Sequence, residues 1–211
     1  MALGRDEFHA ALASRHGAER QARFGAASVA VCGLGGLGSN VAIALARAGV
    51  GHLHLVDFDR VEPSNLNRQQ YAVSQVGMAK ADALRENIAA ANPYCEVRAE
   101  ALRITPDNIG TLFADDDIVC EAFDRADQKA MLVSGVMEAF PGKPVVAASG
   151  MAGLGPANLI STRRVSRNLY VCGDFESDAD GGQGLYGARV LVCAAHQATA
   201  ILRIIAGEFE V

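Results

Sequence analysis

SVAVCGLGGLGSN, residues 28–40, runs from a short apolar segment through a glycine-rich turn into the start of a helix. Residues 28–32 predict a buried strand, and residues 40–48 have the composition of a helix. Between them lie four glycines, of which Gly33, Gly35 and Gly38 satisfy the pattern G-x-G-x-x-G and Gly36 is the fourth. Glycines let the backbone approach a phosphate closely, and free N–H groups at a helix start stabilise its charge. The stretch therefore predicts a strand–turn–helix unit that binds a nucleotide.

An acid follows this turn at the distance expected for nucleotide binding. Asp57 ends the next predicted strand, residues 52–56, about 20 residues beyond the glycines. A carboxylate there can bind a ribose hydroxyl. A glycine-rich turn without a ligand is the competing interpretation, but so many glycines are a costly way to join two elements, because glycine loses much backbone entropy. These two features alone are compatible with either NAD or ATP.

Strands and helices alternate over the first 150 residues, which predicts a parallel sheet covered by helices on both faces. The expected strands are residues 28–32, 52–56, 96–101, 117–122 and 144–148. The expected helices are residues 7–24, 40–48, 77–91, 128–140 and 190–206, and a further helix starts at Thr105-Pro106. After Met151 the pattern changes. Residues 159–163 and 169–172 predict short strands outside the parallel order, and the glycine-rich residues 173–187 predict a flexible lid or a disordered crossover.

The fold class we expect is doubly wound, Rossmann-like α/β with a small antiparallel C-terminal extension. One domain would span residues 1–211, with a helical segment at 1–24, a nucleotide-binding core at 28–150, and strands, a glycine-rich loop and a C-terminal helix at 151–211.

Composition narrows the class of protein. The 211 residues include 50% hydrophobic residues, and the net charge of −5 disfavours a general nucleic-acid binder. Five cysteines without a Cys-x-x-Cys pair argue against a disulfide framework and a zinc ribbon, so no zinc is expected. Because the first residues lack a signal-peptide pattern and residues 190–206 carry polar groups, we expect a cytoplasmic protein with no membrane partner.

Three charged residues favour ATP over NAD. Arg68 lies in a polar loop and Lys80 in the first turn of the following predicted helix, so both could neutralise a leaving pyrophosphate. Asp124 follows the apolar strand at 117–122, at the carboxyl end of a parallel strand where ligands bind. A single carboxylate facing a triphosphate suggests a magnesium ligand. Each of these residues taken alone would be interpreted as a solvated surface charge. Taken together they favour ATP, because hydride transfer to or from NAD does not need two cations and a carboxylate around a triphosphate.

These residues resemble the ThiF/MoeB/HesA family, the bacterial relatives of ubiquitin-activating enzymes. The resemblance covers residues 28–151. It rests on the glycine turn, AGVG at 48–51, LVDFD at 55–59, SNLNRQ at 64–69, GMAK at 77–80 and Asp124. The short length and the tail, with NLY at 168–170, Gly184-Leu185 and AAHQ at 194–197, are similar to small ThiF-type proteins of thiamine biosynthesis.

The resemblance implies ATP- and Mg²⁺-dependent adenylation of the C-terminal glycine of a small ubiquitin-like, ThiS-like sulfur carrier, carried out by a homodimer. The implied catalytic residues are Arg68, Lys80, Asp124 and Arg15, with Asp124 as the magnesium ligand. The implied nucleotide-binding residues are Gly33, Gly35, Gly36, Gly38, Asp57, Asp59, Asn65, Asn67, Arg68, Lys80, Asp124 and Arg125. Gly36 would border the phosphates, and Asp57 would bind the ribose. In-line displacement at phosphorus depends mostly on positioning and charge stabilisation, which suits these residue types.

The sequence departs from the family pattern at three points. The two zinc-binding Cys-x-x-Cys pairs are absent, and Arg125 stands where many members have asparagine. Family dimers often insert an N-terminal arginine into the partner's site. Arg15, Arg20 and Arg23 are the candidates for this role, and Arg15 is favoured because the other two fall on the helix that leads into the first strand.

Most of the remaining cysteines and histidines are expected to serve in packing. Among the cysteines, Cys172 is the better candidate for a covalent intermediate, whereas Cys193 is expected in a core helix. His52 and His54 share one face of a strand but lack a third metal ligand, and residues 115–117 predict a solvated turn. Two other functions stay open at this stage, an NAD-dependent oxidoreductase and a non-catalytic nucleotide-binding module.

Overall fold

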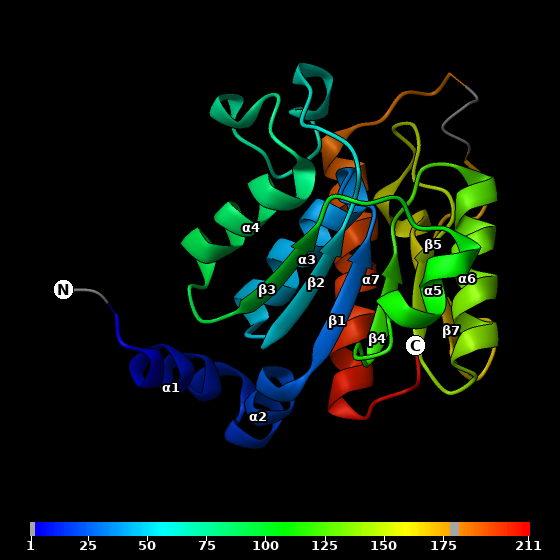
Figure 1. Ribbon diagram of the computed structural model, residues 1–211. Helices are drawn as coiled ribbons and strands as arrows, with labels where there is room; N and C mark the ends of the chain where they lie inside the picture. Colours follow the sequence, from blue (N-terminus) through cyan, green and yellow to red (C-terminus); the bar gives the residue numbers. More distant parts are fainter. Residues whose placement is uncertain (1–2, 178–181) are drawn as a thin grey trace.

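A seven-stranded sheet runs through the computed structural model, which describes residues 3–177 and 182–211 (Figure 1). The strand order is β3-β2-β1-β4-β5-β7-β6, and every neighbouring pair is parallel except β6 with β7. The strands are β1 (Ser28–Cys32), β2 (His52–Val56), β3 (Glu96–Glu100), β4 (Ile118–Glu121), β5 (Val145–Ala148), β6 (Ser161–Arg164) and β7 (Leu169–Gly173). The predicted doubly wound sheet with an antiparallel C-terminal extension is confirmed.

Helices cover both faces of this sheet (Figure 1). They are α1 (Arg5–His16), α2 (Ala18–Ala26), α3 (Gly36–Ala48), α4 (Lys80–Ala91), α5 (Pro106–Leu112), α6 (Ala126–Ala139) and α7 (Gly187–Ala206), with short 3-10 turns η1 (Pro63–Asn65), η2 (Val73–Gln75) and η3 (Ala157–Leu159). Alternate residues of β1 enter opposite cores, because successive side chains of a strand point to opposite faces. Val29 and Val31 pack with α3, α4 and α7, whereas Ala30 and Cys32 pack with α5 and α6.

The strand order changes direction at β1. The chain passes from β1 to β2 on one side, and later returns to place β4 on the other side of β1. In open parallel sheets of this kind, the crevice outside the carboxyl ends of such strands is where ligands bind. The glycine turn after β1 and the loop after β4 therefore meet at the expected binding edge.

The N-terminal helix predicted over residues 7–24 is two helices. Gly17 separates α1 from α2 with φ +84°, a conformation that glycine adopts without steric cost. Helix α1 has no buried residue, and Figure 1 shows it extending from the end of the sheet at which the strands begin. Arg15 lies in its last turn.

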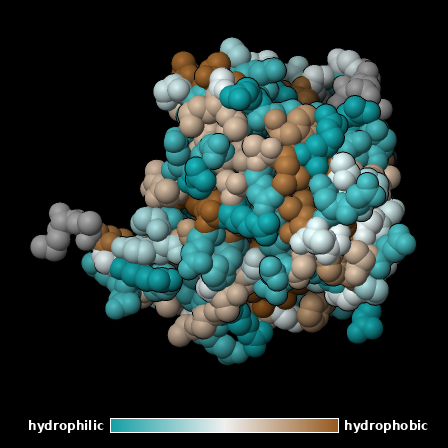
Figure 2. Space-filling model, in the orientation of Figure 1, coloured by the Kyte–Doolittle hydropathy of each residue, from teal (hydrophilic) through white to brown (hydrophobic). Residues whose placement is uncertain are grey.

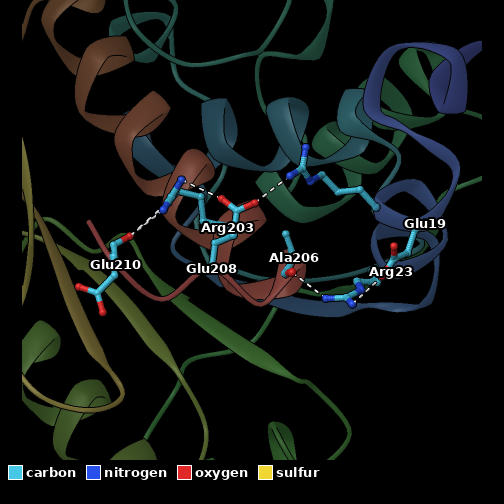
Figure 3. A network of polar contacts seen from close by, with 7 residues as sticks. Glu19, Arg23, Arg203, Ala206, Glu208 and Glu210 are labelled. Carbon is cyan, nitrogen blue, oxygen red and sulfur yellow. Dashed lines mark hydrogen bonds and ion pairs between the residues drawn. The ribbon is translucent and has the colours of Figure 1, made fainter.

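The end of α7 and Glu208, which follows it, contact α2 (Figure 3). Arg203 forms an ion pair with Glu208 at 2.9 Å, and Arg23 donates to the Ala206 carbonyl at 2.7 Å. Arg20 also contacts Glu208, at 2.8 Å. Each exposed pair contributes little stability alone. Arg20 and Arg23, two candidates for a residue donated to a partner, are thus engaged within their own chain.

Two local predictions are wrong. Strand β7 joins the parallel order beside β5, so that only β6 is antiparallel. Asp116 is not in a solvated turn but is 6% exposed, accepting from the Ser28 hydroxyl at 3.0 Å and lying 2.9 Å from Nδ1 of His54. His54 is accordingly a paired core histidine. The predicted lid at 173–187 falls partly on residues 178–181, which lie outside the described part of the chain.

Helix α7 is long and apolar enough to cross a membrane by length and composition, but half of it is buried within the protein. It packs against α3 and the sheet, with Cys193, Gln197 and Ile201 fully buried. This is the buried C-terminal helix that the sequence predicted. On the face shown in Figure 2, hydrophilic residues predominate and apolar residues form small patches.

Candidate functional site

A pocket of roughly 440 Å³ opens at the carboxyl ends of β1 and β4. Its walls come from the glycine turn, the loop after η1, the first turn of α4, and the loops after β4, β5 and β7. Arg68, Lys80 and Asp124 all line it together with Gly36. A larger cavity of roughly 790 Å³ lies between β6 and α7, but it contains none of these residues. We therefore take the smaller pocket as the candidate site.

The glycine turn places a helix start at this pocket. Gly33 has φ +85°, and α3 begins at Gly36. The N-cap residue is Gly35, so no side chain caps the start of the helix. The first N–H groups of α3 are thus free of a competing side chain and can bind an anion. A Cβ at Gly38 would overlap the Gly33 carbonyl oxygen, whereas a Cβ at Gly35 would meet only the Gln69 amide, at 3.7 Å.

Gly38→Ala is therefore expected to destabilise the protein by about 2–3 kcal/mol, because the added methyl group forces the strand and helix apart. Gly35→Ala is the matched control in the same turn, and its expected cost is within about 1 kcal/mol. Urea unfolding of both variants followed by circular dichroism measures the difference. Equal stability of the two variants would contradict the close approach of Gly38 to Gly33.

Asp57 is held in place at the end of β2. Its Oδ2 accepts from the Leu34 backbone N–H at 2.6 Å, and its Oδ1 accepts from that of Asp59 at 2.8 Å. Burial raises the pKa of Asp57, although these hydrogen bonds oppose the shift. Asp57 lines a second pocket of roughly 120 Å³, and Phe123 and Asp124 line both pockets. A nucleoside placed at Asp57 would thus have its phosphates beside Asp124.

Two cations face the main pocket from neighbouring loops. The Lys80 side chain is only 8% exposed, and its Nζ lies 3.0 Å from Oδ2 of Asp59, which is half exposed. Arg68 donates through Nη1 to the Ser64 carbonyl at 3.0 Å and to Oδ1 of Asn67 at 2.8 Å. Arg68 is held by its own loop, and Lys80 by Asp59 of the loop after β2, before any ligand binds, which reduces the reorganisation that binding requires.

A buried ion pair that the sequence analysis missed lies under the Asp124 loop. Both carboxylate oxygens of Glu121 are 2.9 Å from Nζ of Lys129, and Oε1 accepts from the Phe123 backbone N–H at 2.7 Å. Burial raises the pKa of Glu121, and the Lys129 contact opposes that shift. Lys129 also lines the pocket. The available signal was a glutamate inside an apolar strand.

Other predicted residues are placed as follows. Asn65 lines the pocket, but its Oδ1 accepts from the Glu62 N–H at 3.0 Å. Asn67 donates to the Leu185 carbonyl at 3.1 Å, linking its loop to the segment before α7. Arg125 is 67% exposed and paired with Asp127. It lines only the smaller pocket.

Arg15 is not brought to this site within one chain. It is exposed on α1. Helix α1 lies at the end of the sheet where the strands begin (Figure 1), whereas the pocket is lined by the loops at their carboxyl ends. Gln69, by contrast, lines the pocket, is 8% exposed and leaves its Oε1 without a partner among the described residues. Its position next to Arg68 in the SNLNRQ motif was the signal for it.

The residues that line the pocket suit Mg²⁺, whose coordination is completed by phosphates and water, better than a metal ion bound only by protein side chains. Among the described residues no group of three or more His, Cys, Asp or Glu side chains could hold a metal. Mg²⁺ needs only one or two carboxylates, since substrate phosphates and water complete its octahedron. Asp124, beside two cations and a helix start, is such a carboxylate.

None of the five cysteines lines the pocket. Cys172 and Cys193 are fully buried, and burial raises the pKa of Cys172 to about 11 and that of Cys193 to about 12. Cys95 is half-buried, and burial raises its pKa to about 12. Thiolates are the nucleophilic form, so these thiols are poorly prepared for covalent catalysis.

Iodoacetamide at pH 8 is expected to modify the folded protein slowly and at Cys95 first, because the other four thiols are buried. In urea all five should react. Mass spectrometry of the intact protein at timed intervals measures this. Rapid labelling of Cys172 in the folded state would show that its thiol is accessible and activated.

Comparisons with known proteins show the family to which the chain belongs. The model described as the ThiF family matches residues 9–211. The chain belongs to the ThiF family. The probable adenylyltransferase/sulfurtransferase MoeZ of Mycobacterium tuberculosis is 40% identical over 152 residues, which are 69% of this chain and 38% of that protein. The adenylyltransferase and sulfurtransferase UBA4 of Eremothecium gossypii is 37% identical over 136 residues, 64% of this chain and 30% of UBA4.

This ThiF-family chain thus spans less than two fifths of the length of these relatives. Another relative, the tRNA threonylcarbamoyladenosine dehydratase of Escherichia coli, is 40% identical over 113 residues, 53% of this chain and 42% of that protein. The crystal structure of the E. coli dehydratase TcdA in complex with ATP superposes with a TM-score of 0.87 at 23% identity, covering 99% of this chain and 98% of that one. At this identity the structural match supports the fold.

Proposed function

We propose that this ThiF-family chain uses ATP to adenylate the C-terminal glycine carboxylate of a small ubiquitin-like sulfur-carrier protein. One observation carries the proposal: Arg68, Lys80 and Asp124 line the same pocket as Gly36 and the start of α3. Named adenylyltransferases among the relatives support the same reaction. NAD chemistry would not require this grouping of two cations and a carboxylate.

In the proposed reaction, a carboxylate oxygen of the carrier attacks the α-phosphorus of ATP. The new oxygen–phosphorus bond forms as the bond from the α-phosphorus to the bridging oxygen breaks, and pyrophosphate leaves with the electron pair. Lys80 and Arg68 stabilise the charge that develops on the transferred and leaving phosphates. Asp124 would hold Mg²⁺, which supplies further charge neutralisation at the phosphates.

The finer parts of the proposal concern the partner and the pathway. A ThiS-like carrier of thiamine thiazole biosynthesis is the proposed substrate, on the resemblance of the short chain and its tail to small ThiF-type proteins. A homodimer is part of the same proposal, in which Arg15, exposed in the last turn of α1, would reach the pocket of the other chain. A cytoplasmic location is part of the same proposal.

Exchange of radiolabelled pyrophosphate into ATP tests this function. Exchange should depend on a purified ThiS-like carrier ending in Gly-Gly and disappear when the last glycine is deleted. Arg85→Met, a change at a half-exposed residue of α4 outside the pocket, should leave exchange unchanged. Tight NAD binding without ATP binding, or no exchange with any diglycine-ended carrier, would overturn the proposal.

A carboxylate on tRNA is the second candidate acceptor, because a tRNA threonylcarbamoyladenosine dehydratase is among the relatives. The net charge of −5 disfavours it, since binding a polyanion requires a basic surface. The same exchange assay with total tRNA in place of the carrier separates the two acceptors.

A further inference from the structure

A second buried ion pair lies outside the cation cluster, between the end of β7 and the start of α7. Nη2 of Arg189 is 2.6 Å from Oδ2 of Asp174, and the two side chains are 5% and 6% exposed. Neither residue lines the nucleotide pocket among the described residues. Because desolvating two charges is expensive, such a pair by itself is weak evidence of added stability. Its remaining contacts indicate what it does.

Arg189 binds the loop after β5 through the rest of its guanidinium. Its Nε donates to the Ala152 carbonyl at 3.2 Å, and Nη1 donates to the carbonyls of Gly155 and Pro156 at 2.5 and 2.9 Å. These directions match the fixed, planar set of donors that arginine alone provides. One side chain therefore joins the loop at residues 150–156 to Asp174.

Asp174 in turn shapes the loop after β7. Its Oδ1 accepts from the backbone N–H groups of Glu176 and Ser177 at 2.9 and 2.8 Å. Burial raises the pKa of Asp174, but hydrogen bonds from Ser177 and Glu176 and the Arg189 contact outweigh it and lower the pKa to about 2. The carboxylate thus keeps its charge, and these bonds, at neutral pH.

The two loops meet along their backbones. Asp174 N–H donates to the Gly150 carbonyl at 2.9 Å, and Phe175 N–H donates to the Ser149 carbonyl at 3.1 Å. Gly150 has φ +82°, and a Cβ there would overlap Asp174, so the approach requires glycine. Phe175 has φ +66° and is the one described non-glycine residue with positive φ. A residue held in this conformation at a pocket wall indicates a wall fixed by its surroundings.

These joined loops border two spaces. Gly150 and Phe175 line the nucleotide pocket, while Gly153 and Gly155 line an adjacent groove of roughly 650 Å³. Glu176 and Ser177 line both spaces, so the groove and the pocket meet at this turn. Gly153 and Gly155 leave room along one side of the groove for an extended chain with small side chains, but only while the Asp174–Arg189 pair, which also lines the groove, maintains the spacing of the loops.

We propose that Asp174 and Arg189 are positioning residues that keep the 149–156 loop and the 174–177 turn at the spacing through which an extended C-terminus reaches the Arg68–Lys80–Asp124 cluster. This inference rests on the proposed function, since the chain that enters is the Gly-Gly tail of the carrier. The pair acts on the second substrate and leaves the nucleotide end of the site unchanged.

Arg189→Met tests the proposal, with Arg189→Lys as the conservative variant and Arg85→Met as the surface control. The KM for a purified ThiS-like carrier should rise about tenfold or more in Arg189→Met, with the ATP Kd and kcat within about threefold of wild type. Arg189→Lys should recover part of the loss, because an ammonium can contact Asp174 but cannot reach every carbonyl. Asp174→Asn, which keeps the shape and one acceptor oxygen, covers the case in which Arg189→Met does not fold.

Amide hydrogen exchange supplies a readout that does not depend on the reaction. Residues 149–156 and 174–177 should exchange about tenfold faster in Arg189→Met, while residues 33–38 stay unchanged. An unchanged carrier KM in Arg189→Met and Asp174→Asn, with normal wild-type turnover, would overturn the positioning role alone. Equal losses of ATP and carrier binding would also overturn it. Absence of carrier-dependent exchange in the wild type would overturn the proposed function as well.

Discussion

Lys80→Met is expected to slow carrier-dependent pyrophosphate exchange by a factor of about a hundred to a thousand. The Lys80 ammonium lies at the pocket wall and is 8% exposed, so that its charge acts at short range with little screening by water. Removing one preorganised charge from a site where negative charge moves between phosphates raises the barrier without removing the glycine turn. The ATP Kd should change far less than the rate.

Folding should survive this change, because the ion-pair partner of Lys80, Asp59, is half exposed and becomes hydrated when the ammonium is lost. Lys143→Met is the matched control. Lys143 lies over the Phe140 ring next to α6, outside the pocket, so its removal should leave the exchange rate unchanged. A Lys80→Met enzyme with more than about a tenth of wild-type activity would contradict the role of this ammonium.

Lys129→Met is expected to lower the free energy of unfolding by about 3 kcal/mol at pH 8, which is the second large effect. The change leaves the Glu121 carboxylate, 1% exposed, without its positive partner. Without the Lys129 contact, the pKa of Glu121 in the folded state rises further above that in the unfolded state. A carboxyl group with a raised pKa in the folded state contributes its full stability below its unfolded pKa and loses it as pH rises. The stability deficit of Lys129→Met relative to wild type should therefore shrink toward pH 5.

Urea unfolding at pH 5 and pH 8 measures this deficit. The double variant Glu121→Leu with Lys129→Met should recover part of the lost stability, because replacing both charges removes the unpaired carboxylate. Recovery should be incomplete, because Glu121→Leu also removes the carboxylate oxygen that accepts the hydrogen bond from the Phe123 N–H. A Lys129→Met protein that is as stable as wild type at both pH values would show that Glu121 is not confined by burial.

Local sequence patterns predicted most of the fold because they report on local chemistry. The apolar residues 28–32 and the glycines after them form β1 and the start of α3, and Thr105-Pro106 begins α5. The same reasoning did not find the break at Gly17, since helical periodicity continues on both sides of it. It also misplaced β7, because a short apolar strand carries no mark of the neighbour or direction that it will take.

The candidate site divides in the same way. Residue type and position relative to the predicted elements were enough to select the glycines, Asp57, Lys80 and Asp124, which lie at or near element ends, whereas Arg68 was selected for its charge in a polar loop. Contacts between side chains of different elements could not be predicted in this way. Glu121 pairs with Lys129, and Asp174 with Arg189, because chain packing buries Glu121, Asp174 and Arg189 and brings their charged partners within reach. Burial and pairing are properties of the assembled molecule, so the walls of the pocket emerge only when the loops after β4, β5 and β7 come together.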